Sequence, residues 1–408
     1  MKKYSFPKEK IKIYLFEKID PAAKATFEEA GYSVECVPDS RQGADLDKIL
    51  EDAHIIGVRS RSKVKAENLA KAKRLLAIGC YSVGTDMVDL DAARNNGVAV
   101  FNAPHSSTRS VAELTVGAVI SLARRLAHNS AKMHKGDWQK SSVGAYEIRG
   151  KSIGIIGYGH IGQQAGLLAE ALGMNVVFYD IVKKLILGRA KTTNPLAELL
   201  STCDYVSMHV PSTPETKDMI GKEQFDLMKK GSYFINYSRG NTVDITALAE
   251  KLKSGHIAGA AVDVFPVEPK SNDDKFESPL QGLDNVILSP HIGGSTVEAQ
   301  KNIGKEVAYS LTKFLENGST EGAVKFPQVN LPSIPGSYRI LNIHQNKPGV
   351  LSSVNNIISE IGANIKGQYL STYEDVGYLI MDLDKGLAEE VQQKIAELPQ
   401  SIKTRILY

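Results

Sequence analysis

The stretch SIGIIGYGHIGQQAGLLAEALGMNVVFYD, residues 152–180, decides the fold of this chain. It opens with an apolar run typical of a buried strand, continues with the glycine pattern GYGHIG at 157–162, and then takes up the apolar spacing of a helix. A second apolar run follows and ends at Asp180. Strand, glycine turn, helix, strand and terminal acid in this order predict a βαβ unit that binds a dinucleotide.

The glycines have separate physical tasks in such a unit. Gly157 permits a tight turn, Gly159 lets the backbone approach a pyrophosphate, and Gly162 lets helix and strand pack closely. His160 and Ile161 open the helix, whose first amide groups and positive dipole end favour phosphate groups. The pattern therefore indicates a cofactor site, although such glycines also occur in ordinary turns.

Asp180 indicates which dinucleotide is bound. A carboxylate at this strand end accepts hydrogen bonds from the adenosine ribose and repels a 2′-phosphate, which favours NAD over NADP. Lys183 and Lys184 follow closely enough to weaken that repulsion, so NADP stays open as the alternative.

The chain on both sides of this unit repeats its architecture. Near-continuous Val/Ile runs separated by helical patterns predict parallel strands buried on both faces, and so two doubly wound, Rossmann-like α/β domains. A long helix over Ser110–Lys135 is expected between the two series of strands. The remaining predicted strands are 11–16, 32–37, 54–58, 75–79, 98–101, 205–210, 232–238, 259–265 and 285–290.

The C-terminal part follows a different pattern. A helix near Ser295–Glu316 is followed by Lys325–Ser337, a linker with three prolines. After it the order βαββαβ predicts a small ferredoxin-like third domain. Its predicted elements are a strand at 338–345, a helix at 349–361, strands at 364–373 and 376–383, a helix at 387–398 and a strand at 401–408.

Composition excludes several classes of protein. The 49 Lys and Arg residues balance 46 Asp and Glu to a net charge of +3, too little for binding nucleic acid through phosphate neutralisation. No apolar run reaches the ~20 residues that span a membrane, and Lys10 and Lys12 interrupt any signal peptide. The three scattered cysteines support neither a disulfide framework nor a metal site, so we expect a cytoplasmic protein without metal.

Three polar residues follow later predicted strands, where open α/β sheets place their ligands. Arg239, Glu268 and His291 suit the oxidation of a 2-hydroxy acid. Histidine can accept the hydroxyl proton, a carboxylate beside it raises its pKa, and arginine pairs with a substrate carboxylate. Taken singly, they can also be a surface arginine, a solvated glutamate beside proline and a helix-capping histidine.

At these residues the chain resembles the NAD-dependent D-isomer-specific 2-hydroxyacid dehydrogenases. Within this family it resembles the shorter, serine-regulated bacterial branch, which has a C-terminal ACT domain. The motifs that carry the resemblance are RSR at 59–61, IGCYSVGTDMVDLDAA at 78–93, FNAPHSSTRSVAE at 101–113, GIIGYGHIG at 154–162, SRG at 238–240, GAAVDVFPVEP at 259–269, SPHIGGST at 289–296 and HQNKPGVL at 344–351. The domains that it implies are a discontinuous substrate-binding domain at 1–104 and 297–328, an NAD-binding domain at 105–296 and an ACT regulatory domain at 337–408.

The resemblance also implies roles for the residues that react. Arg239 would bind the substrate, and His291, paired with Glu268, would accept the proton in oxidation and donate it in reduction. Asp263 would face the nicotinamide amide. The residues expected to line the cofactor beside it are Tyr237, Ser238, Gly293 and Gly294.

The substrate residues are expected in the N-terminal domain. Two arginines and a hydroxyl at Arg59, Ser60 and Arg61 suit a phosphate dianion, and the alternative is a solvated basic turn. By resemblance, Val83 and Gly84 hold the substrate carboxylate. Lys140 would reach the site from a neighbouring subunit.

The implied reaction is the NAD-dependent oxidation of 3-phospho-D-glycerate to 3-phosphooxypyruvate, the first step of serine synthesis, with reduction of 2-oxoglutarate as a possible side reaction. A glyoxylate or hydroxypyruvate reductase and a non-catalytic NADH-sensing protein are the alternatives. In the small domain, His344, Asn346 and Asn364 would bind L-serine as an effector, although from sequence alone HQNKPG is an ordinary strand-to-helix loop. A homotetramer is expected, because ACT ligand sites usually need two chains.

Overall fold

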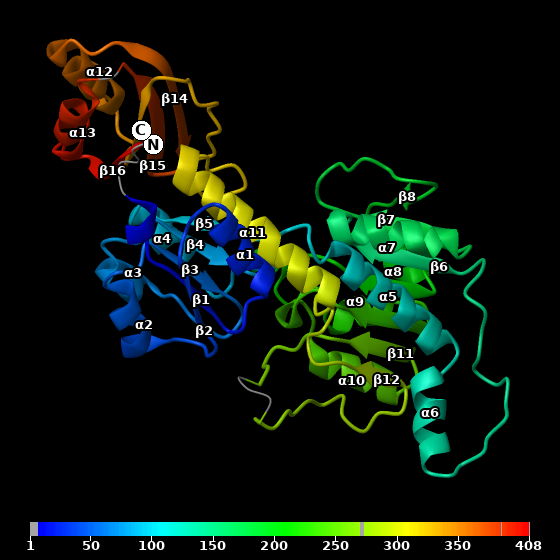
Figure 1. Cartoon of the computed structure of the whole chain (residues 1–408). Coiled ribbons are helices and arrows are strands. Elements are labelled where there is room, and N and C mark those ends of the chain that lie inside the picture. Colours follow the sequence, from blue (N-terminus) through cyan, green and yellow to red (C-terminus); the bar gives the residue numbers. More distant parts are fainter. Residues whose placement is uncertain (1–6, 270–272, 385, 408) are drawn as a thin grey trace. The chain divides into compact units, whose positions relative to one another are not determined.

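A computed structural model describes residues 7–269, 273–384 and 386–407 (Figure 1). Residues 1–6 of the expected N-terminal domain and Tyr408 of the last predicted strand lie outside the described residues. The chain forms two compact units: the first is Met1–Ser106 with Gln300–Tyr408, and the second is Ser107–Ala299. Among the described helices, none combines the length and the apolar character needed to cross a membrane.

The first unit contains a five-stranded parallel sheet. Its order is β2 (Val34–Val37), β1 (Ile13–Phe16), β3 (Ile55–Val58), β4 (Ala77–Cys80) and β5 (Ala99–Phe101). The chain order changes direction between β1 and β3, and parallel sheets bind their ligands at the carboxyl ends of the strands at such a point. The other elements of this part are a 3₁₀ turn at Lys8–Lys10, α1 (Pro21–Glu29), α2 (Gly43–Leu50), α3 (Ala66–Lys71), α4 (Leu90–Asn95) and α11 (Val297–Asn317).

Both faces of this sheet are covered, which explains its near-continuous apolar strands. Val307, Leu311 and Phe314 of α11 share one core cluster with Phe101 of β5. On the other face, Leu46 of α2 and Leu69 of α3 pack in a second cluster with β3 and β4.

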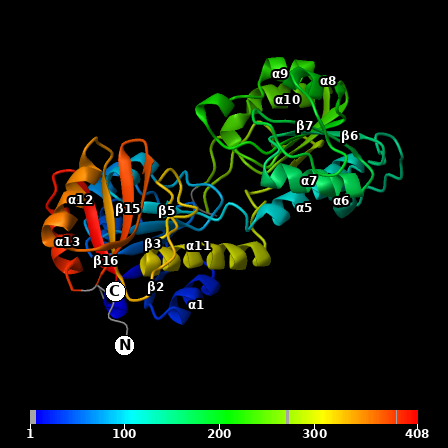
Figure 2. The same cartoon turned by 90° about the horizontal axis from the view of Figure 1, so that it is seen from above.

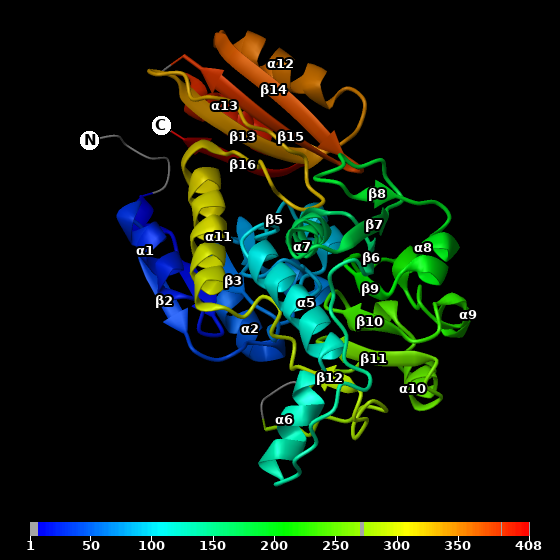
Figure 3. The same ribbon diagram turned by 90° about the vertical axis from the view of Figure 1, so that its right-hand side faces the viewer.

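The second unit contains a seven-stranded parallel sheet (Figure 3). Its order is β12 (Val286–Leu288), β11 (Ile257–Val262), β10 (Ser232–Asn236), β9 (Tyr205–Met208), β6 (Ser152–Ile156), β7 (Asn175–Tyr179) and β8 (Lys191–Thr192). Helices α5 (Thr108–Ala123) and α7 (His160–Ala171) cover one face, and α8 (Leu196–Thr202), α9 (Lys222–Leu227) and α10 (Ile245–Lys253) cover the other. Two 3₁₀ turns lie at Pro214–Thr216 and Gly240–Thr242. The predicted pair of doubly wound parallel sheets is confirmed.

One predicted element is wrong. The continuous helix expected over Ser110–Lys135 is broken into α5 and α6 (Leu126–His134), because Arg125 between them adopts a left-handed conformation with φ of 52°. A second difference lies at β8, a short exposed strand in a segment that gave no sequence signal.

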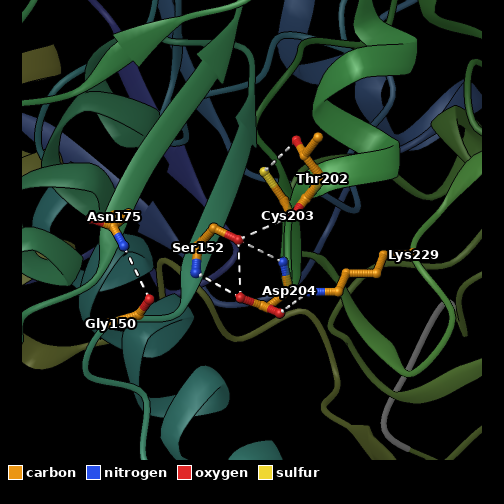
Figure 4. Close-up of polar contacts among 7 residues, drawn as sticks. All are labelled: Gly150, Ser152, Asn175, Thr202, Cys203, Asp204 and Lys229. Carbon is orange, nitrogen blue, oxygen red and sulfur yellow. Dashed lines mark hydrogen bonds and ion pairs between the residues drawn. The ribbon is translucent and has the colours of Figure 1, made fainter.

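The amino ends of the strands in the second unit are joined by hydrogen bonds (Figure 4). Asp204, just before β9, accepts hydrogen bonds from the backbone N–H (2.9 Å) and the hydroxyl (3.0 Å) of Ser152 in β6. Lys229 Nζ completes the group at 2.7 Å from Asp204 Oδ1. These contacts hold the amino ends of the strands together, whereas a parallel sheet binds its ligands at the carboxyl ends.

The C-terminal part has the predicted βαββαβ order, and its sheet is antiparallel (Figure 2). The strand order is β14 (Ile365–Tyr373), β15 (Val376–Leu383), β13 (Tyr338–Gln345) and β16 (Ser401–Leu407). Helices α12 (Val350–Ile361) and α13 (Ala388–Ala396) cover one face. The sequence prediction of a ferredoxin-like domain is therefore confirmed.

The other face of the antiparallel sheet packs on the rest of the first unit. Leu341 and Tyr378 belong to the same core cluster as Phe314 of α11. Arg94 of α4, buried, forms an ion pair with Glu374 in the β14–β15 turn at 2.5 Å. Lys403 of β16, half-buried at this interface, donates to a backbone carbonyl of the parallel-sheet part. The two sheets of the first unit thus share one core.

Candidate functional site

The glycine turn after β6 has the shape that a dinucleotide requires. Gly157 has a φ of 91°, and a Cβ there would lie 2.9 Å from the carbonyl carbon of His209. A Cβ on Gly162 would lie 2.2 Å from the carbonyl oxygen of Gly157, so α7 approaches the turn closely. A Cβ on Gly159 would meet no described atom within 4 Å. The backbone of Gly159 therefore borders open space, into which a pyrophosphate fits.

Asp180 lies beside this turn. Its carboxylate accepts hydrogen bonds from the backbone N–H groups of Tyr158 (2.8 Å) and Val182 (2.9 Å). Lys184 Nζ lies 3.9 Å from Asp180 Oδ2. Two backbone donors thus fix the Asp180 carboxylate next to the start of α7, which begins with His160 and Ile161. An adenosine ribose would be held at this position.

Glu268 and His291 form a hydrogen-bonded pair. His291 Nδ1 lies 2.9 Å from Glu268 Oε2 and 3.1 Å from Oε1, and the N–H of Phe265 donates to Oε1 at 3.0 Å. The hydrogen bond that His291 donates to Glu268 raises the pKa of His291, against the effects of burial and of the Arg239 charge. Burial acts to raise the pKa of Glu268, but the bond and charge of His291 lower it overall. The pair therefore favours a charged carboxylate and a histidine that binds its proton more tightly than usual.

Asp263 holds the loop that carries His291. It is 1% exposed, and its carboxylate accepts hydrogen bonds from the Ser289 hydroxyl (2.6 Å) and the N–H groups of Ile292 (2.9 Å) and Gly293 (2.8 Å). His291 has a φ of 54°, and its N–H donates to the Asp263 carbonyl at 2.8 Å. This loop-holding role was not predicted from the sequence. The position of an acid directly after β11 was the feature that could have indicated it.

A close backbone contact brings Arg239 to the pair. A Cβ on Gly240 would lie 2.0 Å from the carbonyl carbon of Phe265, so only glycine allows this approach. The carbonyl of Arg239 accepts hydrogen bonds from Thr242 Oγ1 (2.7 Å) and Asn236 Nδ2 (3.0 Å). The structure thus brings Arg239, Glu268 and His291 together at the carboxyl edge of the seven-stranded sheet.

The other residues expected at the cofactor lie at the same edge. Tyr237 is buried, which raises its pKa. Ser238 donates to Asn236 Oδ1 through its N–H (3.1 Å) and its hydroxyl (2.8 Å). A Cβ on Gly294 would lie 3.2 Å from Cβ of Ser107, at the start of α5.

The predicted phosphate residues follow β3 in the first unit. Arg59 is half-buried, and burial lowers its pKa against the opposing charge of Glu17, while Arg61 and Ser60 are exposed. Glu17, directly after β1, accepts hydrogen bonds from backbone N–H groups of this turn, among them that of Arg61 at 2.9 Å. Sequence reasoning missed Glu17. Its only signal was an acid at the end of a predicted strand.

The turn after β4 is also held by side chains. The carbonyl of Val83 accepts a hydrogen bond from Asn102 Nδ2 at 2.5 Å, and that of Gly84 accepts one from the Ser82 hydroxyl at 2.7 Å. The turn lies beside the Arg59–Arg61 turn, because β3 and β4 are neighbours in the sheet. Lys140, in contrast, lies in an exposed loop after α6 in the second unit.

The three residues expected to bind serine do not all meet within one chain. His344 is buried, and Asn346 donates from Nδ2 to the Glu374 carbonyl at 2.9 Å. Asn364 instead bonds to Asp384, at the opposite end of the sheet.

Comparisons with known proteins agree with this architecture. The model of the D-isomer specific 2-hydroxyacid dehydrogenase NAD binding domain matches residues 116–293, and that of the AHAS small subunit-like ACT domain matches residues 340–403. The D-lactate dehydrogenase of Aquifex aeolicus, solved with NAD and lactic acid, shares 31% identity with a TM-score of 0.68, covering 79% of this chain and 100% of its own.

Two relatives match over the whole length. The D-3-phosphoglycerate dehydrogenase of Dictyostelium discoideum is 50% identical over 404 residues, 99% of each chain. That of Escherichia coli strain K12 is 50% identical over 411 residues, 100% of each chain. The predicted cofactor is confirmed as NAD. The chain belongs to the D-3-phosphoglycerate dehydrogenases, within the NAD-dependent D-isomer specific 2-hydroxyacid dehydrogenases.

Proposed function

We propose that this enzyme oxidises 3-phospho-D-glycerate to 3-phosphooxypyruvate with NAD⁺. The observation that carries the proposal is the Glu268–His291 pair beside Arg239. It supplies a proton acceptor and a cation at the ligand edge of an NAD-binding sheet. The D-3-phosphoglycerate dehydrogenases that match the whole chain support this choice of substrate.

The division of labour follows from the contacts of the three side chains. Because His291 Nδ1 is bonded to Glu268, Nε2 is the nitrogen that accepts the proton of the substrate C2 hydroxyl. Glu268 then stabilises the imidazolium, and Arg239 holds the substrate carboxylate and the developing carbonyl. NAD⁺, when bound, would supply the acceptor for the hydride from C2, and Gly157–Gly162 and Asp180 would hold its pyrophosphate and ribose. In reduction the same imidazolium returns its proton.

The phosphate is assigned to Arg59, Ser60 and Arg61, at the carboxyl ends of the neighbouring strands β1 and β3. Replacing both arginines with glutamine should raise the KM for 3-phosphoglycerate far more than it lowers kcat, because these groups bind the end of the substrate that does not react. An unchanged KM in the double variant would contradict this assignment.

Two alternatives are separated by one assay. A glyoxylate or hydroxypyruvate reductase would prefer an unphosphorylated oxo acid, and a non-catalytic NADH-binding protein would not oxidise NADH with any oxo acid. We expect higher kcat/KM for 3-phosphooxypyruvate than for hydroxypyruvate. Slow reduction of 2-oxoglutarate is also expected, because contacts to a carboxylate and a carbonyl are generic.

We further propose that L-serine binds between two ACT domains. Strand β14 is an edge strand of nine residues, Ile365–Tyr373, with Tyr369 at its centre and 51% exposed. Antiparallel pairing of two copies about Tyr369 would place Asn364 of one protomer opposite Glu374 of its partner. Glu374 is bonded to Asn346. A twofold axis would thus unite the expected serine residues, which one chain separates.

Mixed oligomers test this arrangement. Asn346→Ala and Asn364→Ala should each weaken serine inhibition. Because a shared site takes one asparagine from each protomer, mixing the two variants should restore one intact site per mixed pair and part of the inhibition. No recovery in the mixture, with serine inhibition of the wild-type enzyme intact, would contradict a shared site.

The homotetramer needs a second interface besides β14. The loop after α6 projects from the second unit (Figure 1) and carries Trp138, 78% exposed, and Val143, 79% exposed, on either side of Lys140. Large apolar side chains that are exposed close together in one loop are typical of a protein interface. Trp138→Ser should reduce the tetramer to dimers by analytical ultracentrifugation, and an unchanged tetramer would rule out this surface.

A further inference from the structure

Glu17 occupies a defined place in the first unit. Strands β1 and β3 are neighbours, and their register pairs Leu15 with Gly57. Two residues further along, Glu17 is therefore level with Arg59, where both strands end. This is also the point at which the strand order changes direction, where parallel sheets bind their ligands. Glu17 thus lies directly beside the turn at Arg59–Ser62.

The carboxylate of Glu17 accepts hydrogen bonds from three backbone donors. Oε1 accepts hydrogen bonds from the N–H groups of Arg59 at 3.2 Å and Ser62 at 2.7 Å, and Oε2 accepts one from that of Arg61 at 2.9 Å. Glu17 is only 9% exposed. Three charge-assisted hydrogen bonds offset the cost of burying the carboxylate, so the turn is wrapped around it.

The backbone supports a specific role for this residue. Glu17 and Lys18 have φ values of 62° and 50°, a left-handed conformation that residues other than glycine rarely adopt. The N–H of Glu17 donates to the Val37 carbonyl of β2 at 3.1 Å, which fixes the conformation. Such local strain is typical of functional sites.

These contacts determine how an anion can meet the turn. Because three amide groups already bond to Glu17, an arriving phosphate is met by the side chains of Arg59, Ser60 and Arg61. The negative charge of Glu17 also opposes the effect of burial on the pKa of Arg59.

We infer that Glu17 is a positioning residue for recognition of the phosphate: it shapes the 59–62 turn that presents both arginines. The inference rests on the proposed function, since it presupposes a phosphorylated substrate. Glutamine at position 17 keeps the size of the side chain but replaces one acceptor oxygen with an NH₂ group, which would face a backbone donor.

The test compares two substrates on the full-length enzyme. For Glu17→Gln we expect the KM for 3-phosphooxypyruvate to rise about 10- to 100-fold with little change in kcat. The kcat/KM for hydroxypyruvate and the affinity for NAD⁺ should stay at wild-type values. Glu51→Gln, which alters an exposed carboxylate at the end of α2, is the matched control and should change nothing.

The outcomes separate the inference from the proposed function. If the wild-type enzyme shows no preference for the phosphorylated substrate, the proposed function fails, and the inference with it. If the arginine variants lose that preference but Glu17→Gln keeps it, only the inference is overturned. An equal loss for both substrates would also overturn it, since that indicates general damage. Should Glu17→Gln not fold, Glu17→Asp keeps the charge on a shorter side chain and should show an intermediate rise in KM; a wild-type KM there would count against the inference.

Discussion

Gly240→Ala tests whether the approach of two loops is required for catalysis. The added Cβ would lie 2.0 Å from the carbonyl carbon of Phe265, whereas ordinary contact begins at 3.4 Å. The loop of Arg239 must therefore move by about 1.4 Å, the difference between these distances. Because a misplacement of about 1 Å can cost about 100-fold in rate, we expect kcat to fall by about 100-fold or more.

The assay is steady-state formation of NADH from 3-phospho-D-glycerate, together with thermal unfolding and NAD⁺ affinity. Gly117→Ala is the matched control, because a Cβ there would meet no described atom within 4 Å and alanine suits a helix better than glycine. If Gly240→Ala folds, binds NAD⁺ and keeps kcat within twofold of the wild type, the spacing between Arg239 and Glu268 does not matter and the reasoning is refuted.

Three further predictions concern charge. In Glu268→Gln the pKa of His291 loses its main raising influence, so the acid-side decline of the oxidation rate should move to lower pH and reduction at neutral pH should slow; unchanged kcat/KM profiles against pH would contradict this. Burial lowers the pKa of Lys403 from 10.5 to about 7. Between these two pH values the unfolded chain therefore binds more protons than the folded protein. Lys403→Met should therefore raise stability by on the order of 3 kcal/mol at pH 6, a gain that shrinks by pH 9.5 in thermal melts; an equal gain at both pH values would argue against it. Arg94→Gln and Glu374→Gln should show a coupling free energy of about 1 kcal/mol in a double-mutant cycle by urea unfolding, because Glu374 is half-exposed; zero coupling would dismiss the ion pair.

The sequence was most informative where the physics is local. The tight turn at Gly157 and the close packing at Gly162 follow from steric rules that act within a few residues, and the βαβ unit was predicted from them. The same holds for the alternation of apolar strands and helices. The break at Arg125 was missed, because a left-handed arginine carries no pattern that neighbouring residues reveal.

Contacts between residues far apart in the sequence could not be predicted from the sequence. Glu17 meets the turn 42 to 45 residues later only because β1 and β3 pair in a particular register. Asp263 holds the histidine loop across 30 residues through Gly293. Strand pairing likewise places Asn364 and Asn346 at opposite ends of one sheet. The roles of the site residues and the domain boundaries stay predictions.

The most direct test of the account is the rate at which a His291→Asn variant forms NADH from 3-phospho-D-glycerate, with NAD⁺ affinity measured on the same sample. Asparagine can neither accept the hydroxyl proton nor form an ion pair with Glu268. We predict a loss of about 1,000-fold or more in kcat with unchanged NAD⁺ affinity. A variant that binds NAD⁺ normally and turns over within tenfold of the wild type would contradict the assignment of His291 as the proton acceptor.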